Sequence, residues 1–263
     1  MLVGTAFLIY WLATTSFGKT SLLDSRPRRN AMAVYTPLIP LIVPLFFGYL
    51  GMRAFRPFTK SFDELVQNLV VIGCTGLVAL VTLIITPFIV KRYFARGFKG
   101  FGLDPRTMGN DFISAITTLL AVWPLVFSVL LATVGIGKLI FGPDFEISKH
   151  EELEMYAKYP QWWSKLIIVV FAVVVAPLYE EILFRGHIQT GLRNLTRDPW
   201  PAIIVSSLFF ASMHPDNPAH WPALFVLSMG LGYAYEKSGS LFQSIFMHAI
   251  FNAVMITATL LQQ

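Results

Sequence analysis

The length and composition of this chain exclude a soluble globular protein. Of its 263 residues, 55% are hydrophobic and only 13% are charged. Its mean hydropathy of +0.63 is too high for the apolar side chains to be hidden in one water-soluble core. The net charge of +5 does not indicate nucleic-acid binding, because the basic residues fall in short loops between apolar runs. Cys74 is the one cysteine, so an internal disulfide and a cysteine-rich metal site are also excluded.

Apolar runs along the chain predict an all-α protein, a polytopic transmembrane bundle of about eight helices. A helix needs roughly 17–25 residues to cross a bilayer. The candidate runs lie at 1–17, 31–51, 66–90, 112–141, 164–195, 200–214, 220–236 and 241–261. No internal repeat or long linker divides them. We therefore expect residues 1–263 to form one membrane domain, in which helices within 1–163 surround core helices within 164–263.

The first run is expected to be a retained span rather than a removed signal peptide. It has no basic region before it and no small-residue cleavage site, and Lys19 follows it instead. The chain should therefore be an integral, multi-pass membrane protein, located in the plasma (cytoplasmic) membrane if the host is prokaryotic.

Prolines predict irregularities in several spans. A proline inside a helix removes a backbone donor, and membrane helices tolerate this where neighbours satisfy the freed carbonyl groups. Kinks or breaks are therefore expected at Pro37, Pro40 and Pro44 in the second run and at Pro87, Pro124 and Pro177 in later runs.

Lysine and arginine in the loops predict the orientation, because they concentrate on the cytoplasmic side. The basic loops follow the first, third and fifth spans, with Lys19, Arg26, Arg28, Arg29, Lys91, Arg92, Arg96, Lys99, Arg106, Arg193 and Arg197. The loop after the fourth span is acidic, with Asp144, Glu146, Glu151, Glu152 and Glu154, and the loop after the sixth has no lysine or arginine. The pattern is broken only after the second span, by Arg53, Arg56 and Lys60. We expect both termini outside.

The fifth span carries three ionisable groups in an otherwise apolar run. Charge at mid-membrane costs at least about 2.5–3.5 kcal/mol per residue on insertion scales, so it is usually kept for a function and given a partner. Glu181 and Arg185 are four residues apart and are expected to form an ion pair along one helix face. Glu180 is rotated by about 100° from Glu181 and stays free to act. Pro177 should bend the helix just before Glu180 and open room for water.

Three polar residues on later spans should converge on Glu180. A short turn at 196–199 makes the fifth and sixth spans antiparallel, so Glu180 and His214 each lie about 22 Å from that turn. On the last span, His248 and Asn252 are four residues apart and share a face. Counted from the turn at 237–240, His248 lies about 12 Å deep and Asn252 about 18 Å deep. Long side chains and helix tilt could close the remaining gap to Glu180.

A carboxylate, two imidazoles and an amide in an apolar cavity are suited to cleaving an amide bond. The carboxylate and one histidine can take a proton from water, while the other histidine and the asparagine can donate hydrogen bonds to the developing oxyanion. Desolvation would tune the carboxylate for this work as a general base.

These residues also resemble a known family. The motifs Glu-Glu-x-x-x-Arg at 180–185, Phe-x-x-x-His at 210–214 and His-x-x-x-Asn at 248–252 occur in that order. They are similar to those of the CPBP (Abi) family of intramembrane proteases, which includes type II CAAX prenyl endopeptidases and bacteriocin-processing and self-immunity proteins. The resemblance covers about the last third of the chain. It implies that Glu180, His214, His248 and Asn252 are catalytic, with Glu181 and Arg185 in support.

The resemblance also bears on substrate and cofactor. It implies an endopeptidase whose partners are the lipid bilayer and a membrane-associated peptide or protein, either lipidated or not, and no nucleic acid. Zn²⁺ bound by Glu180, His214 and His248, with Asn252 holding the oxyanion, remains an alternative to direct activation of water. We favour direct activation and assign no cofactor.

Each polar group also has a purely structural interpretation. The Glu181–Arg185 pair and the His248 and Asn252 side chains could simply join packed helices, and His187 and His220 are expected to be structural or interfacial. His150-Glu151-Glu152-Leu153-Glu154 resembles the start of a zinc-protease motif, but Glu154 stands where that motif needs histidine, so a solvated face is expected. A transporter is disfavoured because the polar groups occupy only one end of the chain. A non-catalytic scaffold or peptide-binding immunity protein is the main alternative.

Overall fold

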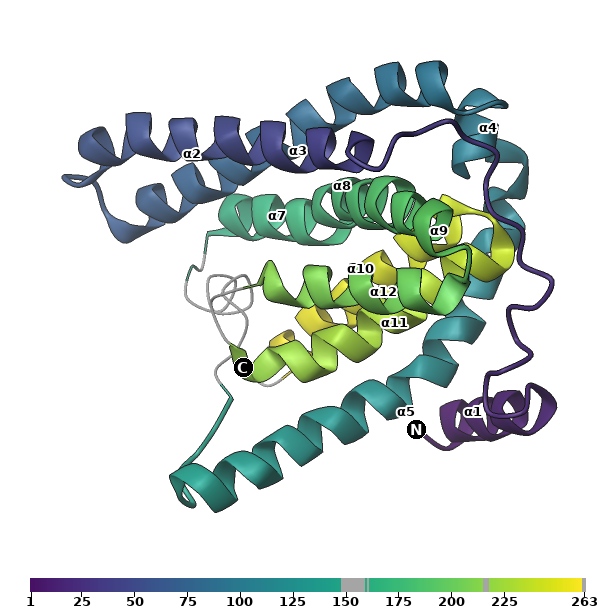
Figure 1. The fold of residues 1–263 in the computed structure, drawn as a ribbon. Helices are drawn as coiled ribbons and strands as arrows, with labels where there is room; N and C mark the ends of the chain where they lie inside the picture. The colour runs from purple at the N-terminus through teal and green to yellow at the C-terminus, as the bar shows by residue number, and fades with distance from the viewer. Residues whose placement is uncertain (148–158, 160, 215–217, 262–263) are drawn as a thin grey trace.

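The protein is helical throughout the part that the structure describes. The computed structural model describes residues 1–147, 159, 161–214 and 218–261. Within these ranges there is no strand, and only an isolated backbone bridge joins Asn30 and Phe94. The predicted all-α class is therefore confirmed (Figure 1).

Every predicted apolar run overlaps a helix. The separate helices are α1 (Leu2–Thr14), α2 (Ile39–Thr59), α3 (Glu64–Tyr93), α4 (Gly97–Phe101), α5 (Met108–Phe141), α10 (Pro199–Ser212), α11 (Trp221–Ser238) and α12 (Leu241–Leu260). One long helical stretch covers the predicted fifth span. It consists of α7 (Trp162–Val170), a π-helical segment (Phe171–Val175), α8 (Ala176–Glu181), a second π-helical segment (Ile182–Gln189) and α9 (Thr190–Thr196).

The number of long spans is lower than the eight runs suggested. Among the described residues, five helical stretches are long and apolar enough to cross a membrane: Thr36–Thr59, Glu64–Tyr93, Pro105–Phe141, Trp162–Thr196 and Leu241–Ala258. The helices α1 and α10 are apolar but shorter. At about 1.5 Å per residue they fall short of the roughly 30 Å thickness of the hydrocarbon core. The five long stretches mark a multi-pass membrane protein.

Prolines do not end these helices. Pro44 lies inside α2, Pro87 inside α3 and Pro124 inside α5. At Pro177 the helix also continues, and a π-helical segment directly precedes α8. The second span begins later than its apolar run, after a 3₁₀ turn at Thr36–Leu38 that contains Pro37.

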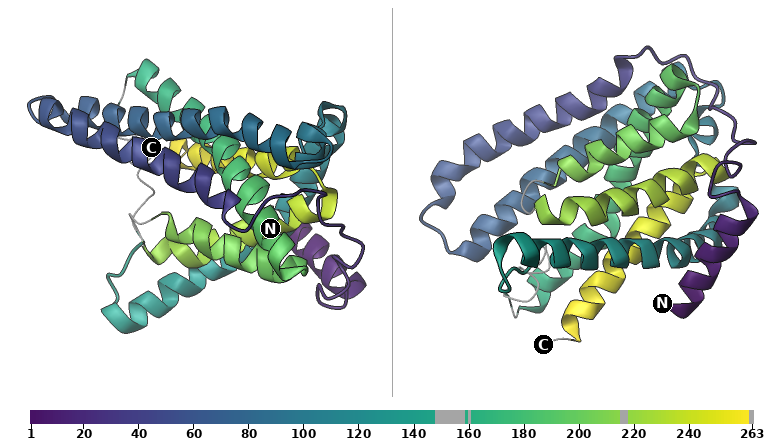
Figure 2. Two further views of the ribbon diagram at one scale, coloured as in Figure 1. Left: turned by 45° about the horizontal axis from the view of Figure 1, so that its top comes forward. Right: turned by 60° about the horizontal axis from the view of Figure 1, so that its bottom comes forward.

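The helices form a central group with a pair on each side. The stretch Trp162–Thr196 packs with α10, α11 and α12 in the centre. The antiparallel pair α2 and α3 lies along one side of this group, and α5 with α1 lies along the other (Figure 2). Buried apolar residues of α5, α11 and α12 form a common core there, including Leu119, Leu227 and Met247. The chain thus places its polar late helices between two apolar layers.

The basic loops gather at one end of the molecule. Lys237 Nζ donates to the Ser21 carbonyl at 2.7 Å, and the Ala31 amide donates to the Tyr93 carbonyl. Nearby, Lys99 Nζ lies 2.7 Å from Asp104 Oδ2, and this hydrogen bond lowers the pKa of the Asp104 carboxyl. The turn between α2 and α3 lies at the opposite end, with the end of α5 (Figure 1). The predicted orientation requires the basic loops to lie on one side of the membrane, and their grouping at one end agrees with this. The assignment of that end to the cytoplasm stays a prediction.

Candidate active site

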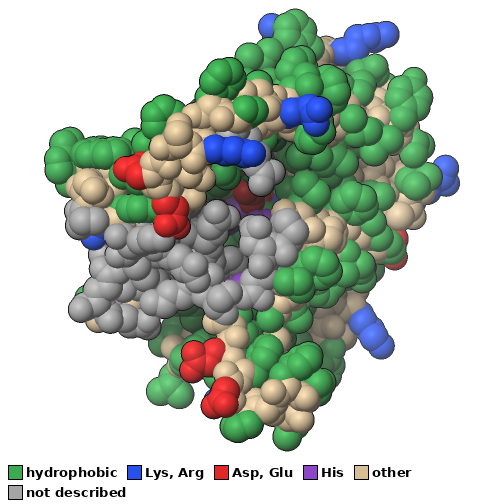
Figure 3. Space-filling view, turned by 90° about the vertical axis from the view of Figure 1, so that its left-hand side faces the viewer, with side chains coloured by type: hydrophobic (Ala, Val, Ile, Leu, Met, Phe, Trp, Pro, Cys, Tyr) green, Lys and Arg blue, Asp and Glu red, His purple; other side chains and the backbone are tan. Residues whose placement is uncertain are grey.

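A cavity of about 320 Å³ lies between the central helices and the α2–α3 pair. The residues that line it include Glu180 and Tyr179 from α8 and His214 just after α10. Most of the wall is apolar and includes Pro40, Leu41, Pro44, Leu45, Val71, Ile72, Val78, Phe171, Leu183 and Phe184. Viewed from the end where α2 meets α3, green side chains cover much of the surface, and carboxylate and histidine atoms are visible in a recess near its middle (Figure 3). The site therefore combines reactive groups with a largely apolar surround.

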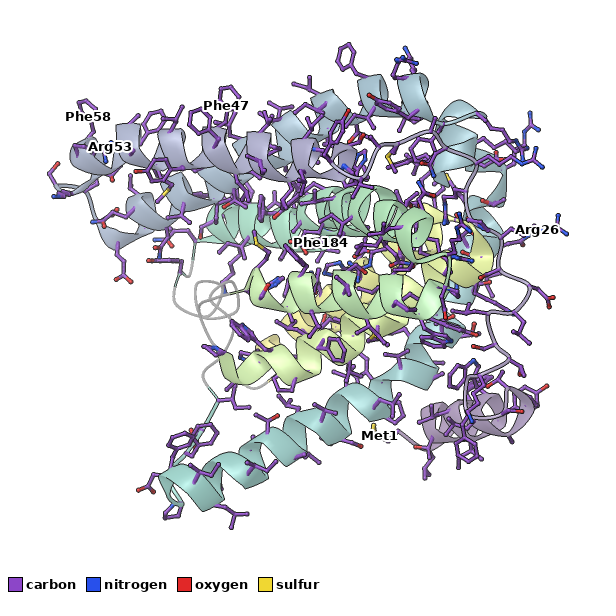
Figure 4. The ribbon with its side chains drawn as sticks, in the orientation of Figure 1. Met1, Arg26, Phe47, Arg53, Phe58 and Phe184 are labelled. Atoms are coloured by element: carbon purple, nitrogen blue, oxygen red, sulfur yellow. The ribbon has the colours of Figure 1, made fainter. Side chains whose placement is uncertain are left out.

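The α2 helix presents two different faces. Phe47, Arg53 and Phe58 project from its outer side, whereas Phe184 lies in the interior beside α10 (Figure 4). Phe58 is 73% exposed, as expected for a side chain that faces lipid. Pro40, Pro44 and Leu45 are among the α2 residues that contribute to the cavity.

Glu181 and Arg185 form the predicted ion pair. Arg185 Nη1 lies 3.1 Å from Glu181 Oε1, and the two side chains are 1% and 0% exposed. Arg185 Nη2 also donates to the Ser228 hydroxyl at 2.8 Å and to the Ser228 carbonyl at 3.1 Å. The guanidinium carbon lies 5.0 Å from the centre of the Phe210 ring. The pair therefore joins the fifth span to α10 and α11, and the Ser228 contact is one that the sequence did not reveal.

His248 lies between the two adjacent carboxylates. Its Nδ1 is 2.9 Å from Glu181 Oε1, and its Nε2 is 3.9 Å from Glu180 Oε2. A carboxylate oxygen only accepts, so Nδ1 carries a proton and donates a hydrogen bond to Glu181. The other ring nitrogen is then the one nearer Glu180. Sequence spacing predicted that His248 approaches Glu180 but did not predict its bond to Glu181.

Glu180 is separate from the Glu181–Arg185 pair, as its position on the helix predicted. Its side chain is 13% exposed and lines the cavity. Each carboxylate thus has a distinct environment, although the two are adjacent in sequence: Glu181 is buried and accepts from Arg185 and His248 through one oxygen, and Glu180 lines the cavity.

His214 lines the same cavity as Glu180. Its Nδ1 lies 2.8 Å from the Phe210 carbonyl. A carbonyl only accepts, so Nδ1–H donates and leaves Nε2 as the unprotonated atom of the neutral ring. His214 is thereby a base rather than a donor at its remaining nitrogen.

Asn252 has a different environment. Its Nδ2 donates to the Ala172 carbonyl at 2.8 Å, and it is not among the residues that line the cavity. Of four predicted site residues, Glu180 and His214 line the cavity and His248 lies beside Glu180, whereas Asn252 contacts the backbone of the π-helical segment.

Glu180, His214 and His248 do not form a three-ligand metal site. Within the described ranges, no three His, Cys, Asp or Glu side chains are grouped so that they could hold a metal ion. The set Glu180, His214 and His248 therefore lacks the arrangement that zinc requires, and we derive no step through a metal.

Other histidines lie away from this space or outside the described ranges. His187 is buried, with Nε2 3.0 Å from the Thr86 hydroxyl and its ring beside Phe101, which fits the structural role expected for it. His220 ends a 3₁₀ turn before α11. The acidic motif at 150–154 lies outside the residues that the structure describes.

Comparison with known proteins gives one match. Neither the curated proteins nor the solved structures include one significantly similar to the chain. A family model described as "Type II CAAX prenyl endopeptidase Rce1-like" matches residues 161–254. The matched segment begins just before α7 and ends within α12, so it contains Glu180, His214, His248 and Asn252. Residues 161–254 are therefore similar to the Rce1-like family of type II CAAX prenyl endopeptidases.

Proposed function

We propose that the protein is an intramembrane endopeptidase that hydrolyses a peptide bond of a membrane-associated peptide or protein. One observation carries the proposal: a carboxylate and an imidazole line a single cavity, and a second imidazole lies beside that carboxylate. The family match of residues 161–254 supports the same reaction class. An apolar wall with a few convergent polar groups is also the usual form of a small binding site.

Glu180 is the general base in this proposal. A water between Glu180 and His214 would lose a proton to the carboxylate, with Nε2 of His214 as a second acceptor that orients it. The hydroxide formed would attack the carbonyl carbon of the bound peptide. The proton held by Glu180 would then pass to the leaving amine, so the overall reaction consumes one water and leaves the protein unchanged.

His248 is the group placed to stabilise the developing oxyanion. Its Nδ1 is fixed by Glu181, so the ring cannot turn freely, and Nε2 stays directed toward the Glu180 side. In the doubly protonated form of the ring, Nε2–H would donate a hydrogen bond to the negatively charged oxygen of the tetrahedral intermediate. A donor held in place before the reaction costs no reorganisation during it.

The substrate enters a site within the membrane-spanning part of the fold. The apolar lining from α2 and α3 suits a peptide segment with large hydrophobic side chains or an attached lipid. Both substrate types fit this chemistry, and released products will distinguish them.

Glu180→Gln tests the proposal. The purified protein in proteoliposomes is incubated with membrane peptides, and released fragments are identified by mass spectrometry. We expect cleavage to fall by at least about 100-fold, the range lost with a general base, while the helical circular-dichroism spectrum is unchanged. Glu146→Gln, at an exposed site that does not line the cavity, is the matched control and should cleave like wild type.

Two outcomes would contradict the proposal. Equal fragment release by wild type and Glu180→Gln would mean that the cavity only binds a partner, as a scaffold would. Loss of wild-type cleavage on adding a zinc chelator, with recovery on adding Zn²⁺, would contradict direct activation of water.

A further inference from the structure

The carbonyl of Ala172 has lost its partner within the helix. The Ala176 amide, which an α turn would direct to Ala172, donates to the Phe171 carbonyl instead. A π turn would direct the next amide, that of residue 177, to Ala172. That residue is proline and has no N–H to donate. Both usual donors are therefore missing at this carbonyl, inside a membrane-spanning helix.

Asn252 supplies the missing donor from another helix. Its Nδ2 lies 2.8 Å from the Ala172 carbonyl oxygen, a normal length for such a bond. Freed carbonyl groups at prolines in membrane helices are usually satisfied by neighbouring side chains. The π-helical segment, the proline and the asparagine thus form one unit, built from two parts of the chain that are 80 residues apart in sequence.

This bond controls where His248 lies. Asn252 and His248 are one helical turn apart on α12, and Ala172 and Glu180 lie on the same continuous helix. Joining Asn252 to Ala172 therefore fixes the axial position of α12 against that helix. It holds His248 where one nitrogen meets Glu181 at 2.9 Å and the other approaches Glu180 at 3.9 Å.

We propose that Asn252 is a positioning residue, which holds His248 in the site by bonding the carbonyl that Pro177 leaves without a donor. The role differs from that of an oxyanion donor, in which the amide would contact the reacting peptide. The proposal rests on the endopeptidase function proposed above.

A double-mutant cycle separates the two roles. Pro177→Ala restores an N–H next to the free carbonyl, so the helix can satisfy Ala172 by itself in either an α or a π turn. We expect Asn252→Leu, which keeps the size but removes the donor, to lower kcat by about tenfold in the Pro177 background with KM unchanged. In the Pro177→Ala background the same substitution should lower kcat by less than about threefold.

The matched control is Asn68→Leu. Asn68 donates to the Tyr159 hydroxyl at 3.1 Å, so the substitution also removes an asparagine hydrogen bond, but one that does not involve Pro177. Its effect should be the same in both backgrounds, because the Asn68–Tyr159 bond involves neither Pro177 nor the Ala172 carbonyl.

The unfolding temperature of all these variants gives a second measurement that needs no activity. Asn252→Leu should lower it more with Pro177 present than with Pro177→Ala. Equal losses of kcat and of unfolding temperature in both backgrounds would overturn the positioning role and leave the endopeptidase intact. Absence of cleavage by the wild type would instead overturn the endopeptidase, while the unfolding temperatures would still decide the role of Asn252.

Discussion

Arg185 is a full positive charge with 1% of its side chain exposed. It is tolerated because acceptors surround it: a Glu181 oxygen on its own helix and two Ser228 oxygens on α11. Buried ion pairs rarely add much stability in themselves, but removing one partner leaves the other charge uncompensated. Arg185 and Glu181 therefore compensate each other's charge next to the site.

Arg185→Met should destabilise the protein strongly. The substitution leaves the Glu181 carboxylate with only His248 as a partner, and such losses cost about 3–5 kcal/mol. Thermal unfolding in detergent, followed by circular dichroism, measures the change. Glu180→Gln, which leaves this ion pair intact, should cost about 1 kcal/mol or less. Similar unfolding temperatures for the two variants would show that the pair is not structural.

Spacing alone predicted much of the site. A separation of four residues gave the Glu181–Arg185 pair, and equal distances from one turn placed Glu180 and His214 at the same depth. The acceptor of Asn252 could not be found in this way, because it depends on a shift from α to π hydrogen bonding that no residue type encodes. The Glu181–His248 bond was missed for a related reason: one carboxylate oxygen serves two partners.

The second π-helical segment, Ile182–Gln189, is the most enclosed element of the fold, and each of its residues is buried. Gly186 lies within it against Phe101 of α4. A Cβ atom added at Gly186 would meet the Phe101 ring at a distance too short for any real contact. Phe101 is itself 0% exposed, so the ring has little room to move. The absence of a side chain at Gly186 allows this close approach.

Gly186→Ala should therefore destabilise the protein, although alanine favours helix more than glycine does. Overpacking of this kind typically costs about 1–3 kcal/mol, which exceeds the gain of roughly 0.5–1 kcal/mol from helix propensity. The control is Gly135→Ala in α5, where nothing lies near the added atom, and which should be neutral or stabilising. Equal unfolding temperatures for the two variants would contradict the packing described here.

Element boundaries show what apolar patterns can and cannot predict. Each apolar run yielded a helix because a span in lipid has to satisfy its own backbone groups. The prolines predicted kinks or breaks, and α2, α3 and α5 continue without a break through theirs. The run at 31–51 placed the second span too early, since its first residues belong to the segment that crosses the basic end and meets Tyr93.

At the scale of the whole molecule, the loop charges predict which end faces the cytoplasm. Buried contacts tie the basic end together: Glu236 lies 3.0 Å from Arg193 and 3.8 Å from Arg28. The N-terminal segment, the end of the fifth span and the end of α11 are therefore held on one side of the membrane.

Single cysteines should reveal this orientation. In a Cys74→Ser background, Arg197→Cys and Arg96→Cys are placed at the basic end, and Ser61→Cys and Asp144→Cys at the other; all four positions are exposed. In intact cells a membrane-impermeant thiol reagent should label Ser61→Cys and Asp144→Cys alone, and cell lysis should expose the other two. The reverse labelling pattern would show that lysine and arginine do not set the topology of this chain.

The wall formed by α2 and α3 has a consequence for how such proteins diverge. Pro40, Pro44 and Thr75 line the cavity but lie outside the segment 161–254 that matches the family model. For a peptidase built in this way, bond breaking and substrate choice are encoded by separate stretches of the gene. Mutations in α2 and α3 can alter which peptides are accepted without changing the reacting groups. Similar sequences in the later helices therefore do not require that two such proteins share substrates.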